Sequence, residues 1–136
     1  MPSAVINFNI WPGKANEHAK ESKLYYKVVI AESQEQFDEY YFNICRKKKP
    51  THVHAASFIA EKPHGNMIGY LLLDRGKLDI ESISHEAAHL TAGYLKVTRK
   101  SLNLQQQNAE ETFAHTVGRC SKKIVDGLVR VGLAEV

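Results

Sequence analysis

Residues 67–97 read MIGYLLLDRGKLDIESISHEAAHLTAGYLKV, and this stretch predicts a strand, a turn and a long helix in succession. Tyr70 to Leu73 form an apolar run that ends at Asp74-Arg75-Gly76, which is typical of a buried strand followed by a turn. Asp79 is placed to cap the next helix, which we expect to end between residues 96 and 100. Apolar residues recur along that helix at helical spacing: Ile83, Ala87, Leu90, Tyr94 and Val97.

The predicted helix carries the pattern H-E-x-x-H at residues 85–89. His85 and His89 lie one turn apart on the same face of a helix, so both imidazoles can bind one metal ion. Glu86 then lies beside the metal without binding it, where its carboxylate can accept a proton from water as a general base. The pattern therefore predicts a hydrolase that holds one Zn²⁺ per chain.

A zinc site of this kind needs a third protein ligand, and a second predicted helix that begins at Asn108 offers two carboxylates. Glu110 and Glu111 follow a polar connection at residues 103–107, and Glu111 lies 22 positions after His89. That separation allows an antiparallel second helix to return to the metal. Glu110 lies nearer the apolar face of this helix, so both carboxylates stay candidates. The apolar face consists of Phe113, Val117, Cys120, Ile124 and Leu128.

The segments His85-Glu86-Ala87-Ala88-His89 and Glu111-Thr112-Phe113-Ala114-His115 together resemble the gluzincins, metallopeptidases whose third zinc ligand is a Glu on a downstream helix. The resemblance covers roughly residues 67–125. It implies Zn²⁺, a peptide or protein substrate, and Glu111 as the preferred third ligand, because Ala114 follows it at the family's spacing. The short chain and the paired glutamates are also similar to small zincin-like proteins encoded by bacteriophages.

The sequence departs from related patterns at three positions. Ala92 and Leu95 stand where the H-E-x-x-H-x-x-G-x-x-H proteases need Gly and a third His, which excludes that branch. His115 stands where thermolysin-like enzymes place an Asp that orients a zinc-bound imidazole.

Several other polar side chains could contact a transition state. His115 and Tyr94 are the two candidates for that role, or for a position behind the metal ligands, although an exposed helix histidine and a core tyrosine are commoner outcomes. Tyr70 is a weaker candidate for the same reason. We interpret the remaining histidines of this region as structural: His52, His54 and His64.

The basic run Arg46-Lys47-Lys48-Lys49 allows two interpretations. Clustered cations can neutralise nucleic-acid phosphates. The run also follows a predicted helix that begins at Ser33, where Ser33 and Gln36 match a capping box, and it precedes Pro50. We favour a helix end, where cations complement the helix dipole, and do not expect nucleic-acid binding.

Whole-chain properties are those of one ordinary domain covering residues 1–136. The chain is 43% hydrophobic and 24% charged, and its net charge of +3 is too small to indicate a partner. Cys45 and Cys120 lack a close pairing motif, which favours reduced thiols in the cytoplasm, or the host cytoplasm for a phage protein. Neither a leader pattern nor an apolar run of about 18 residues is present, so we expect no secretion and no membrane span.

The order of elements predicts an α+β fold with a small twisted mixed sheet of about four strands packed with three helices. Strands are expected at residues 6–10, 24–31, 53–61 and 67–73, and helices from residues 33, 79 and 108. The resemblance implies a zincin-like arrangement in which residues 67–72 form an exposed edge that binds substrate backbone. The sequence thus predicts a zinc-dependent peptidase; the alternatives are a zincin-like binding protein without turnover and, less favoured, a nucleic-acid-binding accessory protein.

Overall fold

The computed structural model describes residues 6–13, 23–50, 53–98 and 108–133, apart from the side chains of residues 61–64. Four strands form one sheet in the order β1-β2-β4-β3. Their bounds are Ile6–Ile10 for β1, Tyr25–Ala31 for β2, Ala55–His64 for β3 and Met67–Asp74 for β4. β2 and β4 run parallel, and the two outer pairs are antiparallel. The prediction of a small mixed sheet with three helices is therefore confirmed.

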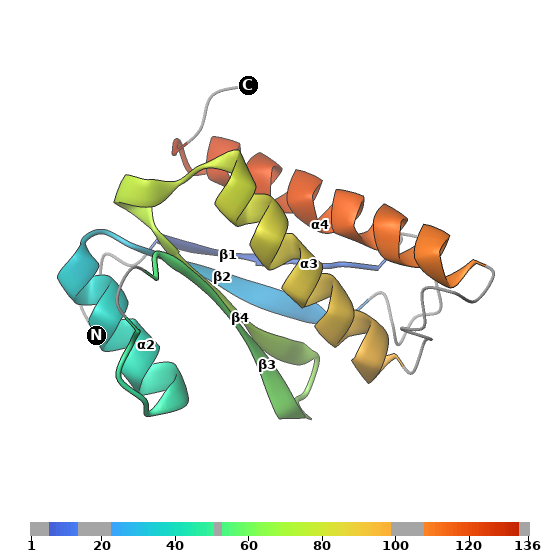
Figure 1. Ribbon diagram of the computed structural model, residues 1–136, viewed down its shortest axis with the longest axis horizontal. Coiled ribbons are helices and arrows are strands. Elements are labelled where there is room, and N and C mark those ends of the chain that lie inside the picture. The colour runs from blue at the N-terminus through green and yellow to red at the C-terminus, as the bar shows by residue number, and fades with distance from the viewer. Residues whose placement is uncertain (1–5, 14–22, 51–52, 99–107, 134–136) are drawn as a thin grey trace.

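In the described part of the chain, three helices cover the two faces of the sheet (Figure 1). They are α2 (Gln34–Cys45), α3 (Ile80–Val97) and α4 (Ala109–Arg130), and a short 3₁₀ turn, η1 (Arg75–Lys77), connects β4 to α3. One face packs against α3 and α4, and the other packs against α2. Within the described residues, no helix combines the length and the apolar character that crossing a membrane would require.

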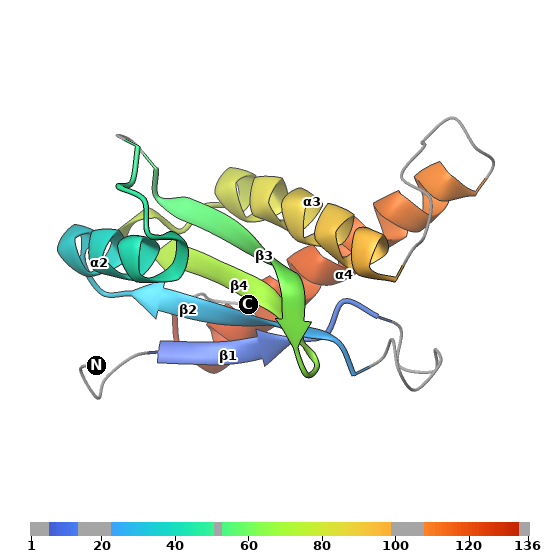
Figure 2. The ribbon, with the colours of Figure 1, turned by 90° about the horizontal axis from the view of Figure 1, so that it is seen from below.

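β4 is a central strand because its apolar residues point to both faces of the sheet. Leu71 and Leu73 belong to the core beneath α3 and α4, whereas Leu72 belongs to the core beneath α2. A strand covered on both faces has an uninterrupted apolar sequence, as this one does. The expected exposed edge at residues 67–72 is therefore wrong: β4 lies between β2 and β3, and β3 is the edge strand on this side of the sheet (Figure 2).

The helix starts follow the predicted capping patterns. The Ser33 side chain accepts a hydrogen bond from the Gln36 amide at 3.1 Å, and the Asp79 carboxylate accepts one from the Ser82 amide at 2.7 Å. α2 ends at Cys45, and Arg46 follows it in the left-handed conformation with φ 61°. The basic run thus begins at the helix end, where Lys49 pairs with Asp38 at 3.4 Å.

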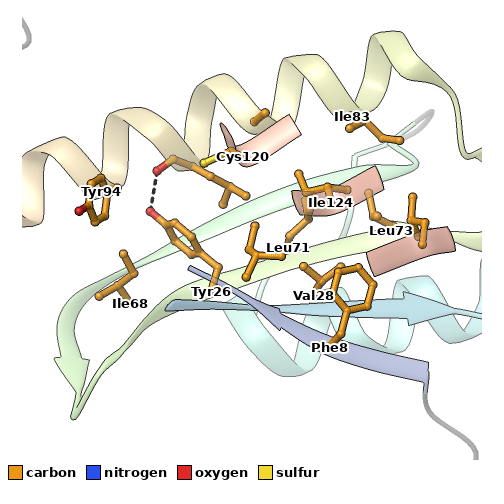
Figure 3. Packing of buried hydrophobic residues seen from close by; sticks show 14 of the residues in the cluster. Phe8, Tyr26, Val28, Ile68, Leu71, Leu73, Ile83, Tyr94, Cys120 and Ile124 are labelled. Carbon is orange, nitrogen blue, oxygen red and sulfur yellow. Dashed lines mark hydrogen bonds between the residues drawn. The ribbon is translucent and has the colours of Figure 1, made fainter. Parts of the chain in front are cut away.

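A buried hydrogen bond joins the sheet to the middle of α3. The Tyr26 hydroxyl donates to the Leu90 carbonyl oxygen at 2.7 Å within the main core (Figure 3). Burial raises the pKa of Tyr26 far above its ordinary value, so the hydroxyl stays protonated and able to donate. Close to it, a β-carbon on Gly93 would lie 2.6 Å from Ile59 Cδ1 and 2.7 Å from the Tyr26 hydroxyl oxygen. The missing side chain lets α3 lie directly against β2 and β3.

We predict that Tyr26→Phe lowers the free energy of unfolding by about 1 kcal/mol, because it removes one buried hydrogen bond without leaving a cavity. Urea denaturation measures this loss. Tyr40→Phe is the matched control, since the Tyr40 hydroxyl is buried without a hydrogen-bond partner among the described residues. Its removal should leave stability unchanged or raise it. Equal losses in the two variants would contradict the role assigned to the Tyr26 hydrogen bond.

Candidate metal and substrate site

The two histidines of the motif meet on the exposed side of α3. Their Nε2 atoms lie 3.2 Å apart, and the rings are 4.8 Å apart between centroids at an interplanar angle of 73°. Two nitrogens bound to one tetrahedral Zn²⁺ at their usual bond lengths are about 3.3 Å apart. His85 and His89 are therefore spaced as two ligands of one ion. In the absence of an ion, the same separation allows one ring nitrogen to donate a hydrogen bond to the other.

Glu86 points toward the edge strand of the sheet. Only 6% of the residue is exposed, and its carboxylate accepts a hydrogen bond from the Ser57 hydroxyl of β3. Ala55, Ser57 and Ile59 alternate toward α3 along this strand, and Ser57 alone among them is polar. In the sequence, Ser57 stands out only as a polar residue on the strand face whose other members are apolar. Its contact with Glu86 could not be predicted without knowing that α3 packs on this face.

A groove runs between α3 and the edge strand β3, and Glu86 lies at its middle. One half is a cleft of about 310 Å³ lined in part by His54, Glu81, Ser82 and His85. The other half is a cleft of about 450 Å³ lined in part by Ile59, His89, Ala92, Gly93 and Lys96. Glu86 lines both clefts. His85 thus lines one cleft, His89 lines the adjoining cleft, and the buried carboxylate belongs to both.

The predicted third ligand lies elsewhere. Glu111 is 77% exposed, and its carboxylate pairs with His115 Nε2 at 3.2 Å on the same helix. Glu110 is also exposed. Among the described residues, no three His, Cys, Asp or Glu side chains are grouped so that they could hold one metal ion. The structure therefore brings together His85, Glu86 and His89 and does not bring Glu110 or Glu111 to them.

The packing of the two long helices explains this separation. α3 and α4 run antiparallel (Figure 1), and the Thr91 hydroxyl contacts the Cys120 sulfur at 3.7 Å, which places these residues at the same level. His89 lies two residues from Thr91, and Glu111 lies nine residues from Cys120 in the opposite axial direction. At 1.5 Å per residue, these eleven residues separate the levels of His89 and Glu111 along the helix axes by about 16 Å. In addition, α4 and β3 lie on opposite flanks of α3 (Figure 1).

The two proposed transition-state donors do not line the groove. Tyr94 is 1% exposed and belongs to the main core (Figure 3). His115 is exposed on α4 and pairs with Glu111. Tyr70 packs on the α2 side of the sheet. Helical and strand phase explain these positions, because each tyrosine occupies an apolar stripe, whereas His115 is turned outward.

His54, interpreted from the sequence as structural, contacts a buried carboxylate and also lines the first cleft. Its Nδ1 atom lies 3.4 Å from Oδ2 of buried Asp74, whose other oxygen accepts the Gly76 amide at 2.9 Å. The ring lines the same cleft as His85 and Glu86. The structure thus adds His54 to the polar groups of the groove. His52 and the connection at residues 103–107 lie outside the described residues, as does the side chain of His64.

Comparisons with known proteins identify no relative. No family model matches the chain, and no curated protein and no solved structure is significantly similar to it. The interpretation of the groove therefore depends on its own geometry.

We predict that the protein binds one Zn²⁺ per chain through His85 and His89, and that His85→Ala and His89→Ala each abolish retention of the metal. Elemental analysis after gel filtration measures it. Glu110→Ala and Glu111→Ala should retain zinc, because both carboxylates are turned away from the histidine pair. His115→Ala is the control and should also retain zinc. If Glu110→Ala or Glu111→Ala loses zinc while this control keeps it, the conclusion that α4 places both carboxylates away from the histidine pair is wrong.

Proposed function

We propose that this protein is a zinc-dependent peptidase that acts on an extended peptide bound in the groove between α3 and β3. The observation that carries the proposal is the 3.2 Å separation of the His85 and His89 Nε2 atoms beside the buried carboxylate of Glu86. A metal-binding pair and a general base next to one groove are the parts that metal-assisted hydrolysis requires. The described residues fit two ligand positions of the ion; they do not supply a third.

Zinc held by this pair would act as a Lewis acid toward a carbonyl oxygen and would make water more acidic. The role assigned to Glu86 is to accept the proton of the attacking water and to transfer it to the leaving amine. Ser57 donates to the Glu86 carboxylate and thereby limits its rotation. A base held at one position does not need to be ordered again in each turnover.

Edge strand β3 supports the binding of a peptide backbone. The Asp74 amide donates to the His54 carbonyl oxygen at 3.1 Å, so in this antiparallel pair residues 54, 56 and 58 bond inward to β4. The amides and carbonyls of Ala55, Ser57 and Ile59 then point to the free edge. A peptide that adds to this edge would pass in front of Glu86, and its side chains would enter the two clefts.

A second candidate function uses the same groove without turnover. Because the described residues supply no third metal ligand, the chain could bind peptides by strand addition as a recognition module. The two functions differ in a single measurement, since the module releases intact peptide and the peptidase releases fragments.

We predict that Glu86→Gln lowers turnover by about 10²- to 10⁴-fold, because it removes the general base and retains the shape of the groove. Cleavage of a mixed peptide library, followed by mass spectrometry, measures turnover, and elemental analysis confirms that zinc is kept. Glu39→Gln on the exposed side of α2 is the matched control and should behave as wild type. Unchanged turnover in Glu86→Gln would disprove the assigned mechanism.

We also predict that Ala55→Pro weakens peptide binding by about two- to tenfold, because it removes one outward amide from the free edge. The Michaelis constant, or the dissociation constant in Glu86→Gln, measures this effect. Ala55→Val keeps the amide and serves as the control for side-chain bulk. Ala56→Pro should instead lower the melting temperature, because its amide bonds inward to β4. Unchanged binding in a folded Ala55→Pro protein would show that substrate does not add to β3.

A further inference from the structure

The groove has a direction, because its two walls run the same way. β3 and α3 run in the same direction (Figure 2). Along β3, Ala55 lines the first cleft and Ile59 the second; along α3, Glu81 lines the first cleft and Lys96 the second. Antiparallel pairs are more common and slightly more stable than parallel ones. A peptide added antiparallel to β3 therefore places its C-terminal part in the first cleft and its N-terminal part in the second.

The two clefts also differ in charge and polarity. Glu81 is exposed at the first cleft, and no ion pair of this residue occurs in the described part of the chain. Carboxylates that line a cleft attract a cationic side chain. The first cleft therefore favours lysine or arginine.

The second cleft is formed mainly by small and aliphatic groups. Ile59, Ala92 and Gly93 line it, and exposed Lys96 stands at the same cleft, likewise without an ion pair among the described residues. The Lys96 ammonium group repels a cation, and the apolar lining favours an aliphatic side chain. Charge complementarity is thus opposite in the two halves of the groove.

We infer that the groove selects an extended peptide with a cationic side chain on the C-terminal side of the bond beside Glu86 and an uncharged aliphatic side chain on its N-terminal side. This inference rests on the proposed function for the position of the reacting bond. The order of the two side chains follows from antiparallel addition to β3, and their chemistry follows from Glu81 in one cleft and from Lys96 with Ile59 in the other.

Two peptides of identical composition test the inference on the zinc-loaded Glu86→Gln protein, which is expected not to cleave them. They are acetylated and amidated, with the sequences Thr-Leu-Thr-Ser-Thr-Lys-Thr-Ser (the Leu-Lys peptide) and Thr-Lys-Thr-Ser-Thr-Leu-Thr-Ser (the Lys-Leu peptide). The two test residues are four positions apart because only alternate side chains of a strand point to the same face, and Ala55 and Ile59 have the same separation on β3. Calorimetry or fluorescence anisotropy gives each dissociation constant. We expect the Leu-Lys peptide to bind about two- to fivefold more tightly, which is the range for one exposed ion pair. Reversing both groove charges, in Glu81→Lys with Lys96→Glu, should reverse the preference.

Glu39→Lys, an exposed charge reversal on α2, is the matched control and should leave the preference unchanged. Equal binding of the two peptides, tighter binding of the Lys-Leu peptide, or no measurable binding of either would overturn the inference. Cleavage by wild type is scored separately. If the Leu-Lys peptide binds more tightly but wild type cleaves no peptide, the inferred selectivity stands and the proposed peptidase activity is refuted. If wild type cleaves peptides but the two test peptides bind equally, the peptidase activity stands and the inferred selectivity is refuted.

Discussion

The close contact of α3 with the sheet is the constraint on which the groove depends. Gly93 has no side chain at the point where Ile59 and the Tyr26 hydroxyl approach the helix, and the same hydroxyl bonds to Leu90 one turn earlier. Together these contacts set the depth and the rotation of α3 on the sheet. At that rotation Glu86 meets Ser57, and the two histidines stay at the solvent side of the groove.

The rotation of α3 also separates the parts of the expected zinc site. One flank of the helix faces β3, and the other packs against α4. Since Thr91 and Cys120 lie opposite each other, the first turn of α4 extends beyond the level of the histidines. Glu111 consequently pairs with its neighbour His115. The two candidate ligands on one helix, His85 and His89, lie close together, whereas the candidate that had to come from a second helix, Glu111, does not lie near them.

Sequence patterns predicted the secondary structure well because their signals are local. Each of these signals depends on residues that are close together in the sequence. They are the cap at Asp79, the apolar stripe of α3 and the run of apolar residues in β4 that face both sides of the sheet. The exposed edge at residues 67–72 was implied by the resemblance to the gluzincins and not by these patterns, and it was wrong. An uninterrupted apolar run such as Leu71 to Leu73 is a feature of central strands, and the edge of the sheet is formed by β3.

The sequence by itself determined that His85 and His89 share one face of a helix with Glu86 beside them, because a spacing of four residues is one helical turn. Only the tertiary structure decided that Ser57 meets Glu86, that His54 enters the same groove and that Glu111 lies apart from it. These relations join residues that are distant along the chain. They depend on strand order and on the axial register of packed helices, and neither is encoded by the periodicity of a single element.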